Sequence, residues 1–85
     1  MKIVLHKSFL KQFRKLPKKL KDQFFDRLEV FEINPFNEVL NNHSLHEPYT
    51  DSRSINVTGD IRAIYEQRGS IALFTHIGTH SELYK

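Results

Sequence analysis

The sequence contains no cysteine and no tryptophan among its 85 residues, and only three glycines and three prolines. Without cysteine, neither a disulfide nor a thiolate zinc site can hold the fold together. No apolar run approaches the roughly 20 residues that a membrane-spanning helix needs. Residues 1–6 form too short an apolar segment for a signal peptide, and no small-residue cleavage site follows them. We therefore expect a cytoplasmic protein that makes no contact with a membrane.

The overall composition is that of a folded domain with a slightly basic surface. Hydrophobic residues make up 39% of the sequence and charged residues 27%, which is ordinary for a globular chain. A chain of this length buries a limited core, and we expect one domain over residues 1–85. The formal net charge of +3 permits a polyanionic partner such as RNA. It does not require one, because many solvated surfaces carry a similar charge.

Three runs in the second half of the sequence are rich in the β-branched and aromatic residues that suit half-buried strands. They cover residues 54–58, 61–65 and 71–77. The Gly-Asp pair at 59–60 is of the kind that closes a two-residue hairpin, because glycine accepts positive φ at no steric cost. The Arg-Gly-Ser stretch at 68–70 supplies a second turn. Short-range patterns alone therefore predict a three-stranded antiparallel meander.

The first half of the sequence predicts a short strand over residues 2–6 and then two helices. Ser8 is a suitable N-cap for the first helix. Pro17 separates it from a second helix over residues 17–33, because proline breaks a helix interior but is tolerated in the first turn. Apolar residues recur along the second helix as a stripe that we expect to pack on the sheet. This stripe consists of Leu20, Phe24, Leu28 and Phe31, widened by Phe25 and Val30.

The fold class follows from the order of these elements. Asn34-Pro35 ends the second helix, since the residue before proline is driven out of the helical region. Residues 36–51 form a connection with a short helical turn at 37–40. The order is β-α-α-β-β-β, which predicts an α+β domain with a helical hairpin packed on a small, mainly antiparallel sheet.

Histidine is the most suggestive residue type in this sequence, because it exchanges protons near neutral pH. Cleavage of RNA by the internal 2′-hydroxyl needs a base, an acid and positive charge at the phosphate, which His, Asp and Arg can provide without a metal. No third ligand joins the His43-x-x-His46 pair, so we predict no metal site and no cofactor. The histidines are His6, His43, His46, His76 and His80.

Each candidate residue also has a plain structural explanation. His80 stands in a polar tail after the last strand, where an active-site residue or an ordinary exposed histidine could lie. His43 falls in the loop before the meander, and turn chemistry accounts for Asp60. Side chains alternate along a strand with a period of two, which directs Arg62 away from the core, towards a phosphate or towards water. The same period places His76 on the face of Phe74 and Ala72.

Two segments resemble the RelE/ParE toxin superfamily, closest to its YafQ-like branch. They are residues 53–65, RSINVTGDIRAIY, and residues 78–84, GTHSELY. The Gly-Thr-His-x-x-Leu-aromatic ending is the more specific of the two, whereas the Arg-x-Ile-Tyr strand is shared more widely across the superfamily. Leu16-Pro17 and Asn34-Pro35 are also typical, so the resemblance covers essentially the whole chain.

This resemblance implies a RelE-like fold and a microbial type II toxin. Toxins of the YafQ-like branch enter the ribosomal A site and cut mRNA without a metal, and a cognate antitoxin wraps and neutralises them. Carried over by position, Asp60 and His80 are the expected acid/base pair, and His43 is an orienting or second proton-transfer residue. Tyr84 stands at the terminal aromatic position and is a candidate for stacking on a base.

The sequence departs from the YafQ-like pattern at two positions. Asn56 stands where these toxins have a further histidine, and it can form hydrogen bonds but cannot transfer a proton. His76 stands where they have an arginine, and it is positive only when protonated. Both remain candidates for substrate binding. Stabilisation of the transition state could therefore pass to Arg62 or Arg53.

Two other functions fit the same fold. One is a toxin of the ParE type, which poisons DNA gyrase without being an enzyme, although ParE-like chains generally lack this set of histidines. The other is a basic RNA-binding module without activity. A ribosome-dependent cleavage assay run beside a supercoiling assay separates the three.

Overall fold

The structure, a computed structural model, describes residues 1–84, and Lys85, the last residue of the expected domain, lies outside the described residues. The elements follow in chain order. They are β1 (Lys2–Leu5), α1 (Lys7–Phe13), α2 (Lys18–Ile33), the 3₁₀ helix η1 (Glu38–Leu40), β2 (His43–Ser44), β3 (Ser52–Asn56), β4 (Ile61–Arg68), β5 (Ile71–Thr79) and α3 (His80–Leu83).

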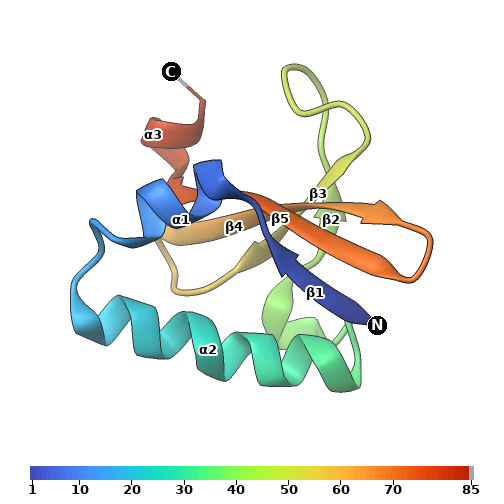
Figure 1. Cartoon of the computed structure of the whole chain (residues 1–85), viewed down its shortest axis with the longest axis horizontal. Coiled ribbons are helices and arrows are strands. Elements are labelled where there is room, and N and C mark those ends of the chain that lie inside the picture. The colour runs from blue at the N-terminus through green and yellow to red at the C-terminus, as the bar shows by residue number, and fades with distance from the viewer. Residues whose placement is uncertain (85) are drawn as a thin grey trace.

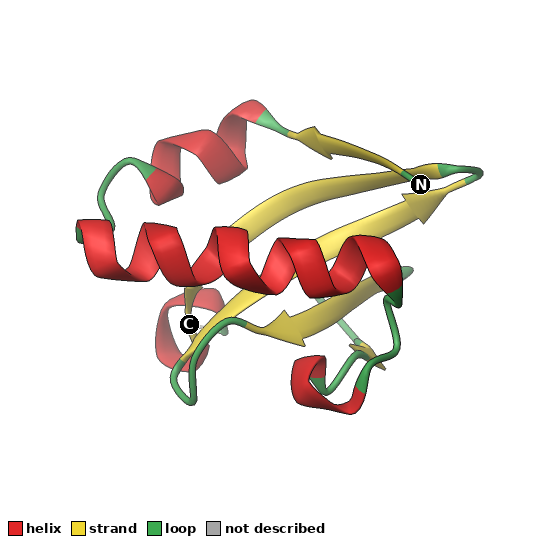
Figure 2. Cartoon of the chain, turned by 90° about the horizontal axis from the view of Figure 1, so that it is seen from below, coloured by secondary structure: helices red, strands yellow, loops and turns green. Residues whose placement is uncertain are grey.

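The strands form one sheet in the order β1-β5-β4-β3-β2. β1 runs parallel to β5, and the other neighbouring strands are antiparallel. Figure 1 shows α2 below the sheet, and α3 and the loop between β2 and β3 above it. Figure 2, seen from the α2 side, shows α2 crossing in front of the strands with α1 returning beside it. The predicted α+β fold is therefore confirmed. The sequence patterns did not predict the short strand β2 or the helix α3.

An aromatic cluster between the helices and the sheet forms the core. Phe9 of α1 and both Phe24 and Phe31 of α2 are fully buried. They pack against Phe74 of β5 and Tyr65 of β4, with ring centroids 5.0 to 6.0 Å apart. Most of these pairs meet edge to face, the arrangement in which the positive ring edge meets the negative ring face. The core thus depends on ring contacts between one layer of helices and the sheet.

The predicted stripe on α2 is confirmed along its centre. Leu20, Leu28 and Val30 are partly buried against the aromatic cluster. The expectation that Phe25 widens the buried stripe is wrong, because its side chain is 46% exposed. Phe25 lies at the margin of the core, where its ring meets Phe13 at a centroid distance of 5.6 Å.

The first helix begins earlier than expected, and His6 rather than Ser8 is its N-cap. His6 Nδ1 accepts a hydrogen bond from the Ser8 N–H at 3.1 Å. The Ser8 hydroxyl instead donates to the Thr75 carbonyl of β5 at 2.8 Å. The prediction of Ser8 as the cap was wrong because its hydroxyl binds the neighbouring strand, and an imidazole nitrogen satisfies the helix in its place.

The expected two-residue hairpin at 59–60 is also wrong. The backbone N–H groups of Val57 and Thr58 both donate to the Ile61 carbonyl, at 2.9 and 3.1 Å, so the loop is wider. The Thr58 hydroxyl closes it by accepting from the N–H groups of Asp60 and Ile61. A threonine side chain therefore does what a left-handed glycine was expected to do, and Gly59 keeps an ordinary φ.

The second turn has the geometry that was expected at the first. Arg68 and Ile71 are paired across β4 and β5, which leaves Gly69 and Ser70 as a two-residue connection. Gly69 has a φ of 59°, the left-handed region that glycine enters without strain. The predicted turn at 68–70 is confirmed.

The buried stripe on α2 makes a testable prediction about stability. Replacing Phe24, which has no exposed surface, by Ala removes a ring from the aromatic cluster and should lower the free energy of unfolding by about 3–5 kcal/mol. Ile33→Ala on the same helix, where the side chain is 88% exposed, should change it by less than about 0.5 kcal/mol. Urea unfolding followed by circular dichroism measures both, and equal effects would contradict the assignment of the core face.

Candidate functional site

The face of the sheet opposite α2 carries most of the predicted site residues. Directly opposed residues of an antiparallel ladder share a face, so the strand register shows which side chains lie together. We call the side away from α2 the open face. Among the described residues, α3 and the loop of residues 45–51 lie on this side (Figure 1).

The first row across the open face holds two of the histidines. His43 of β2 is opposite Ser54 of β3, Ser54 is opposite Ile64 of β4, and Ile64 is opposite His76 of β5. Four adjacent strands span roughly 14 Å at the usual spacing between strands. Ser54 and Ile64 are buried, whereas His43 is exposed and His76 is half-buried. The row therefore presents an imidazole at each end.

His76 reaches this row because β5 contains a bulge. Ile64 pairs with His76 but Tyr65 pairs with Phe74, so Thr75 is an extra residue on β5. The expectation that His76 shares a face with Phe74 and Ala72 is therefore wrong. The extra residue reverses the alternation of side chains, as a β-bulge does.

A second row lies nearer the end of the β4–β5 ladder. Asn56 of β3 is opposite Arg62 of β4, and Arg62 is opposite Gly78 of β5. Arg62 Nη1 donates a hydrogen bond to the Asn56 amide oxygen. Arginine has five N–H donors, so further donors of Arg62 can face a phosphate. The predicted direction of Arg62, away from the core, is confirmed.

Asp60 and His80 leave the sheet at the same end. Ile61 and Thr79 are the last pair of the ladder, Asp60 precedes Ile61, and His80 follows Thr79. Both Asp60 and His80 are exposed. The register thus brings the expected acid/base pair to one edge of the open face, next to the row of Asn56 and Arg62.

His80 is the first residue of α3, which lies where the sequence predicts a polar tail. The Thr79 hydroxyl accepts from the Glu82 N–H at 3.1 Å, and the Glu82 carboxylate accepts from the Thr79 N–H at 2.8 Å. This reciprocal pair is a capping box, which fixes the first turn of a helix. Gly78 leaves room for it, because a Cβ at Gly78 would lie 3.2 Å from Glu82 Oε1.

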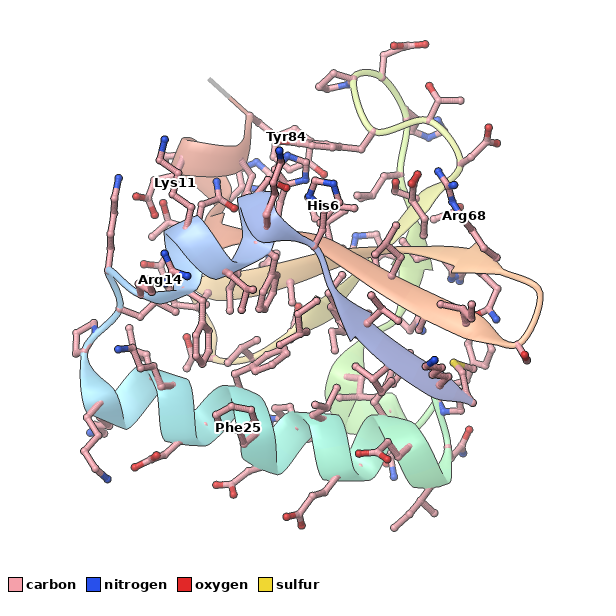
Figure 3. The ribbon with its side chains drawn as sticks, viewed as in Figure 1. His6, Lys11, Arg14, Phe25, Arg68 and Tyr84 are labelled. Atoms are coloured by element: carbon pink, nitrogen blue, oxygen red, sulfur yellow. The ribbon has the colours of Figure 1, made fainter. Side chains whose placement is uncertain are left out.

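A chain of aromatic rings links the first row to His80. His76 meets Tyr49 at 5.1 Å between ring centroids, Tyr49 meets Tyr84 at 5.4 Å, and Tyr84 meets His80 at 4.7 Å. The sequence patterns did not identify Tyr49, because it lies in an irregular loop without periodicity. Tyr84 lies above the sheet, on the side away from Phe25 and α2 (Figure 3). Its ring is therefore part of the site on the open face.

Hydrogen bonds orient both histidines of the first row. His43 Nδ1 lies 2.8 Å from the Asn41 carbonyl, which can only accept, so Nδ1 carries the proton. The Thr75 hydroxyl donates to the Ile64 carbonyl and accepts from His76 Nδ1 at 3.0 Å. In their neutral forms both rings therefore have Nε2 as the basic nitrogen.

His76 has a perturbed proton affinity. Burial lowers its pKa, nearby His6 lowers it further, and Glu66 opposes the shift. A buried imidazole loses solvation on protonation, which favours the neutral form. His76 is therefore a poor substitute for a permanently charged arginine at this position.

Arg53 is not part of this arrangement. It pairs with Tyr65, so it lies on the α2 side of the sheet. Arg53 Nε donates to the Asn42 amide oxygen at 2.7 Å, and the guanidinium lies over the Phe36 ring at 5.1 Å from its centroid. These contacts hold the connection after α2, and of the two arginines only Arg62 lies on the open face.

Residues 1–84 contain neither a cluster of metal ligands nor a membrane-spanning helix. No group of three or more His, Asp or Glu side chains is gathered there as ligands for a metal ion. Within the same residues, no helix combines the length and apolarity that a membrane crossing requires.

Comparisons with known proteins find similarity to a family of bacterial toxins and to solved toxin structures. The model of the family described as "Bacterial toxin of type II toxin-antitoxin system, YafQ" matches residues 1–85. The crystal structure of YafQ from E. coli is 25% identical, with a TM-score of 0.79, and the match covers 98% of this chain and 97% of that one. The E. coli DinJ-YafQ complex gives 25% identity, a TM-score of 0.76, and the same coverage of 98% and 97%. A YoeB/ParE toxin from Agrobacterium tumefaciens, 18% identical, shares the fold with a TM-score of 0.77 and coverage of 94% and 99%. Curated proteins give no match.

The lowered pKa of His76 makes a prediction about stability and pH. Below an ordinary histidine pKa of 6.5 the unfolded chain takes up a proton that the folded protein resists. The His76 contribution to stability is therefore constant above this pH and declines as the pH falls through 6.5 towards the folded pKa. Urea unfolding at about pH 7.5 and about pH 5 should show a smaller loss for His76→Gln than for wild type. An unchanged loss in His76→Gln would contradict the assignment.

Proposed function

This chain belongs to the YafQ family of toxins of bacterial type II toxin–antitoxin systems, and on this basis we propose that it is a ribosome-dependent endoribonuclease that inhibits translation by cutting mRNA. The proposed reaction is attack of the internal 2′-hydroxyl on the adjacent phosphate, without a metal. The 5′-oxygen of the next nucleotide leaves. Such a reaction requires a base, an acid and positive charge held in one place.

The main support for the proposal is that residues of these types lie together at one edge of the open face. Asp60 and His80 leave the sheet beside the last ladder pair, and Arg62 lies on the adjacent row. All three side chains are at least partly accessible. An edge that presents a carboxylate, an imidazole and a guanidinium has the groups that 2′-hydroxyl attack needs.

We assign roles from the chemistry of each group. His80 transfers a proton at the 2′-hydroxyl or at the leaving oxygen, since histidine does so near neutral pH. Asp60 acts as its partner, either as the base or by orienting the imidazole or the substrate. Arg62 stabilises the charge that develops on the phosphate, as it has donors beyond the one given to Asn56. Asn56 contributes hydrogen bonds alone.

The two histidines of the first row have supporting roles in this proposal. His43 has its Nδ1 proton fixed by the Asn41 carbonyl, so its Nε2 is available to orient substrate or to accept a proton. His76 is half-buried and favours the neutral form, which suits binding through hydrogen bonds rather than through charge. Tyr84 offers ring surface for stacking on a base, which aromatic residues do without reading the sequence.

We further propose the partners of this domain, residues 1–85. The mRNA is cut on the ribosome in the cytoplasm, where the A site aligns the 2′-oxygen with the phosphorus, so free RNA is a poor substrate. A cognate antitoxin neutralises the toxin. Support for the antitoxin comes from the E. coli relative, whose structure is a complex of YafQ with DinJ.

Replacing His80 tests the proposal directly. His80→Ala should slow cleavage of ribosome-bound mRNA by about 10²- to 10⁴-fold, which is typical for loss of one general acid or base. Growth arrest on expression should weaken accordingly. His46→Ala is the matched control, because His46 is another exposed histidine and lies in the loop of residues 45–51, outside the proposed machinery. Cleavage by His80→Ala at the wild-type rate, with equal protein level and melting temperature, would overturn the assignment.

A further inference from the structure

We propose that Tyr49 is a positioning residue that holds α3, and with it His80 and Tyr84, against the open face. The inference rests on the proposed function for its effect on cleavage, but the contact itself is independent of that function. Tyr49 lies in the loop of residues 45–51, more than 30 residues before α3, and its hydroxyl donates to the Leu83 carbonyl at 2.5 Å.

The helix α3 needs such support because it has only four residues. An isolated helix of this length does not form in water, since the cost of nucleation is not recovered by later turns. The capping box fixes its first turn at Thr79 and Glu82. Carbonyls in the last turn of a helix need donors from outside the helical ladder, and the Leu83 carbonyl accepts from the Tyr49 hydroxyl. The side chain of Leu83 is buried, so both ends of α3 are anchored.

Tyr49 is itself held firmly enough to act as an anchor. Its N–H donates to the His46 carbonyl at 2.9 Å, and its carbonyl accepts from the Ser52 N–H at 3.0 Å. Its ring packs against His76 of β5 on one side and Tyr84 on another. Burial raises the pKa of the Tyr49 hydroxyl, so it stays protonated and remains a donor.

The contact controls the position of His80 through one helical turn. The Tyr84 N–H donates to the His80 carbonyl at 3.0 Å, and the Tyr84 ring lies against the His80 imidazole, tilted by 35°. Loss of the Tyr49 hydroxyl frees the Leu83 carbonyl, which lies between these two residues in the chain. A proton-transfer group displaced by even 1 Å loses much of its effect on rate. Tyr49 therefore acts through α3 rather than on the substrate.

A matched pair of Tyr→Phe variants tests this inference. Tyr49→Phe keeps the ring and removes the hydroxyl that binds Leu83. Tyr65→Phe removes a hydroxyl that accepts from Asn42 Nδ2 at 2.7 Å on the α2 side of the sheet, away from α3. Both variants lose one hydrogen bond of a tyrosine hydroxyl, so a general loss of stability appears in both.

Two measurements are made on each variant. The first is the hydrogen-exchange rate of the Tyr84 amide, which reports whether α3 is formed, together with the nuclear Overhauser contact between the Tyr84 and His80 rings. The second is the single-turnover cleavage rate of ribosome-bound mRNA at saturating toxin, with the toxin concentration at half-maximal rate. We expect Tyr49→Phe to raise Tyr84 exchange roughly fivefold to tenfold and to slow cleavage by a similar factor. The rate at saturation reports the position of His80, and a rise in the half-saturating concentration reports displacement of the Tyr84 ring. Tyr65→Phe should change neither the exchange nor the cleavage rate.

The outcomes separate this inference from the proposed function. Unchanged Tyr84 exchange and ring contact in Tyr49→Phe would overturn the anchoring contact. Faster exchange with an unchanged cleavage rate would overturn the positioning role. If wild type does not cleave ribosome-bound mRNA, the proposed function fails and the positioning role fails with it, whereas faster exchange in Tyr49→Phe alone would still support the anchor.

Discussion

One extra residue in β5, Thr75, determines which side chains in the last part of this strand reach the open face. Up to Phe74 the strand pairs with β1 and alternates regularly, and beyond it the register shift sends His76 to the open face and Ile77 into the core. Without the bulge these two residues would exchange faces, because side chains alternate with a period of two.

Beyond Phe74, where β1 no longer pairs with β5, the helix α1 contacts the strand instead. Its Ser8 hydroxyl donates to the Thr75 carbonyl, and its Gln12 side chain accepts from the Ile77 N–H. The first helix therefore both covers the core and fixes the irregular part of the strand.

The packing of the helices explains why the proposed site lies on the other side of the sheet. The aromatic core joins α1 and α2 to one face through ring contacts from Phe9 to Tyr65, so apolar packing occupies that face. The opposite face is covered only in part, by the loop around Tyr49 and by α3. The proposed substrate, mRNA on the ribosome, is large, and groups that act on it need this accessible side. The same arrangement makes α3 depend on contacts from outside its own short sequence.

Much of the fold could be predicted from local patterns, and the exceptions have physical causes. The spacing of Phe24 and Phe31 was sufficient to find the core face of α2, because a helical period extends over many residues. The bulge is visible in the sequence as a change in the spacing of apolar residues. The core residues of β5 are two positions apart up to Phe74 and then three positions apart to Ile77. The alternation of side chains along a strand also places Arg53 on the same face as buried Ile55. Arg62 lies on the opposite face, since it pairs with Asn56. For α3 the only local sign was the Thr79-x-x-Glu82 capping box. Tyr49 could not be found, because its partners lie far along the chain.

The proposed cleavage by the internal 2′-hydroxyl, at the edge formed by Asp60, His80 and Arg62, determines which chemical groups end the cut mRNA. The wild-type toxin is incubated with ribosome-bound mRNA, and the new 3′ ends are identified by mass spectrometry. Attack by the 2′-oxygen leaves a 2′,3′-cyclic phosphate or a 3′-phosphate on one fragment and a 5′-hydroxyl on the other. We expect those ends. Fragments with a 3′-hydroxyl and a 5′-phosphate would contradict it, because they require water or another external nucleophile and a different leaving group.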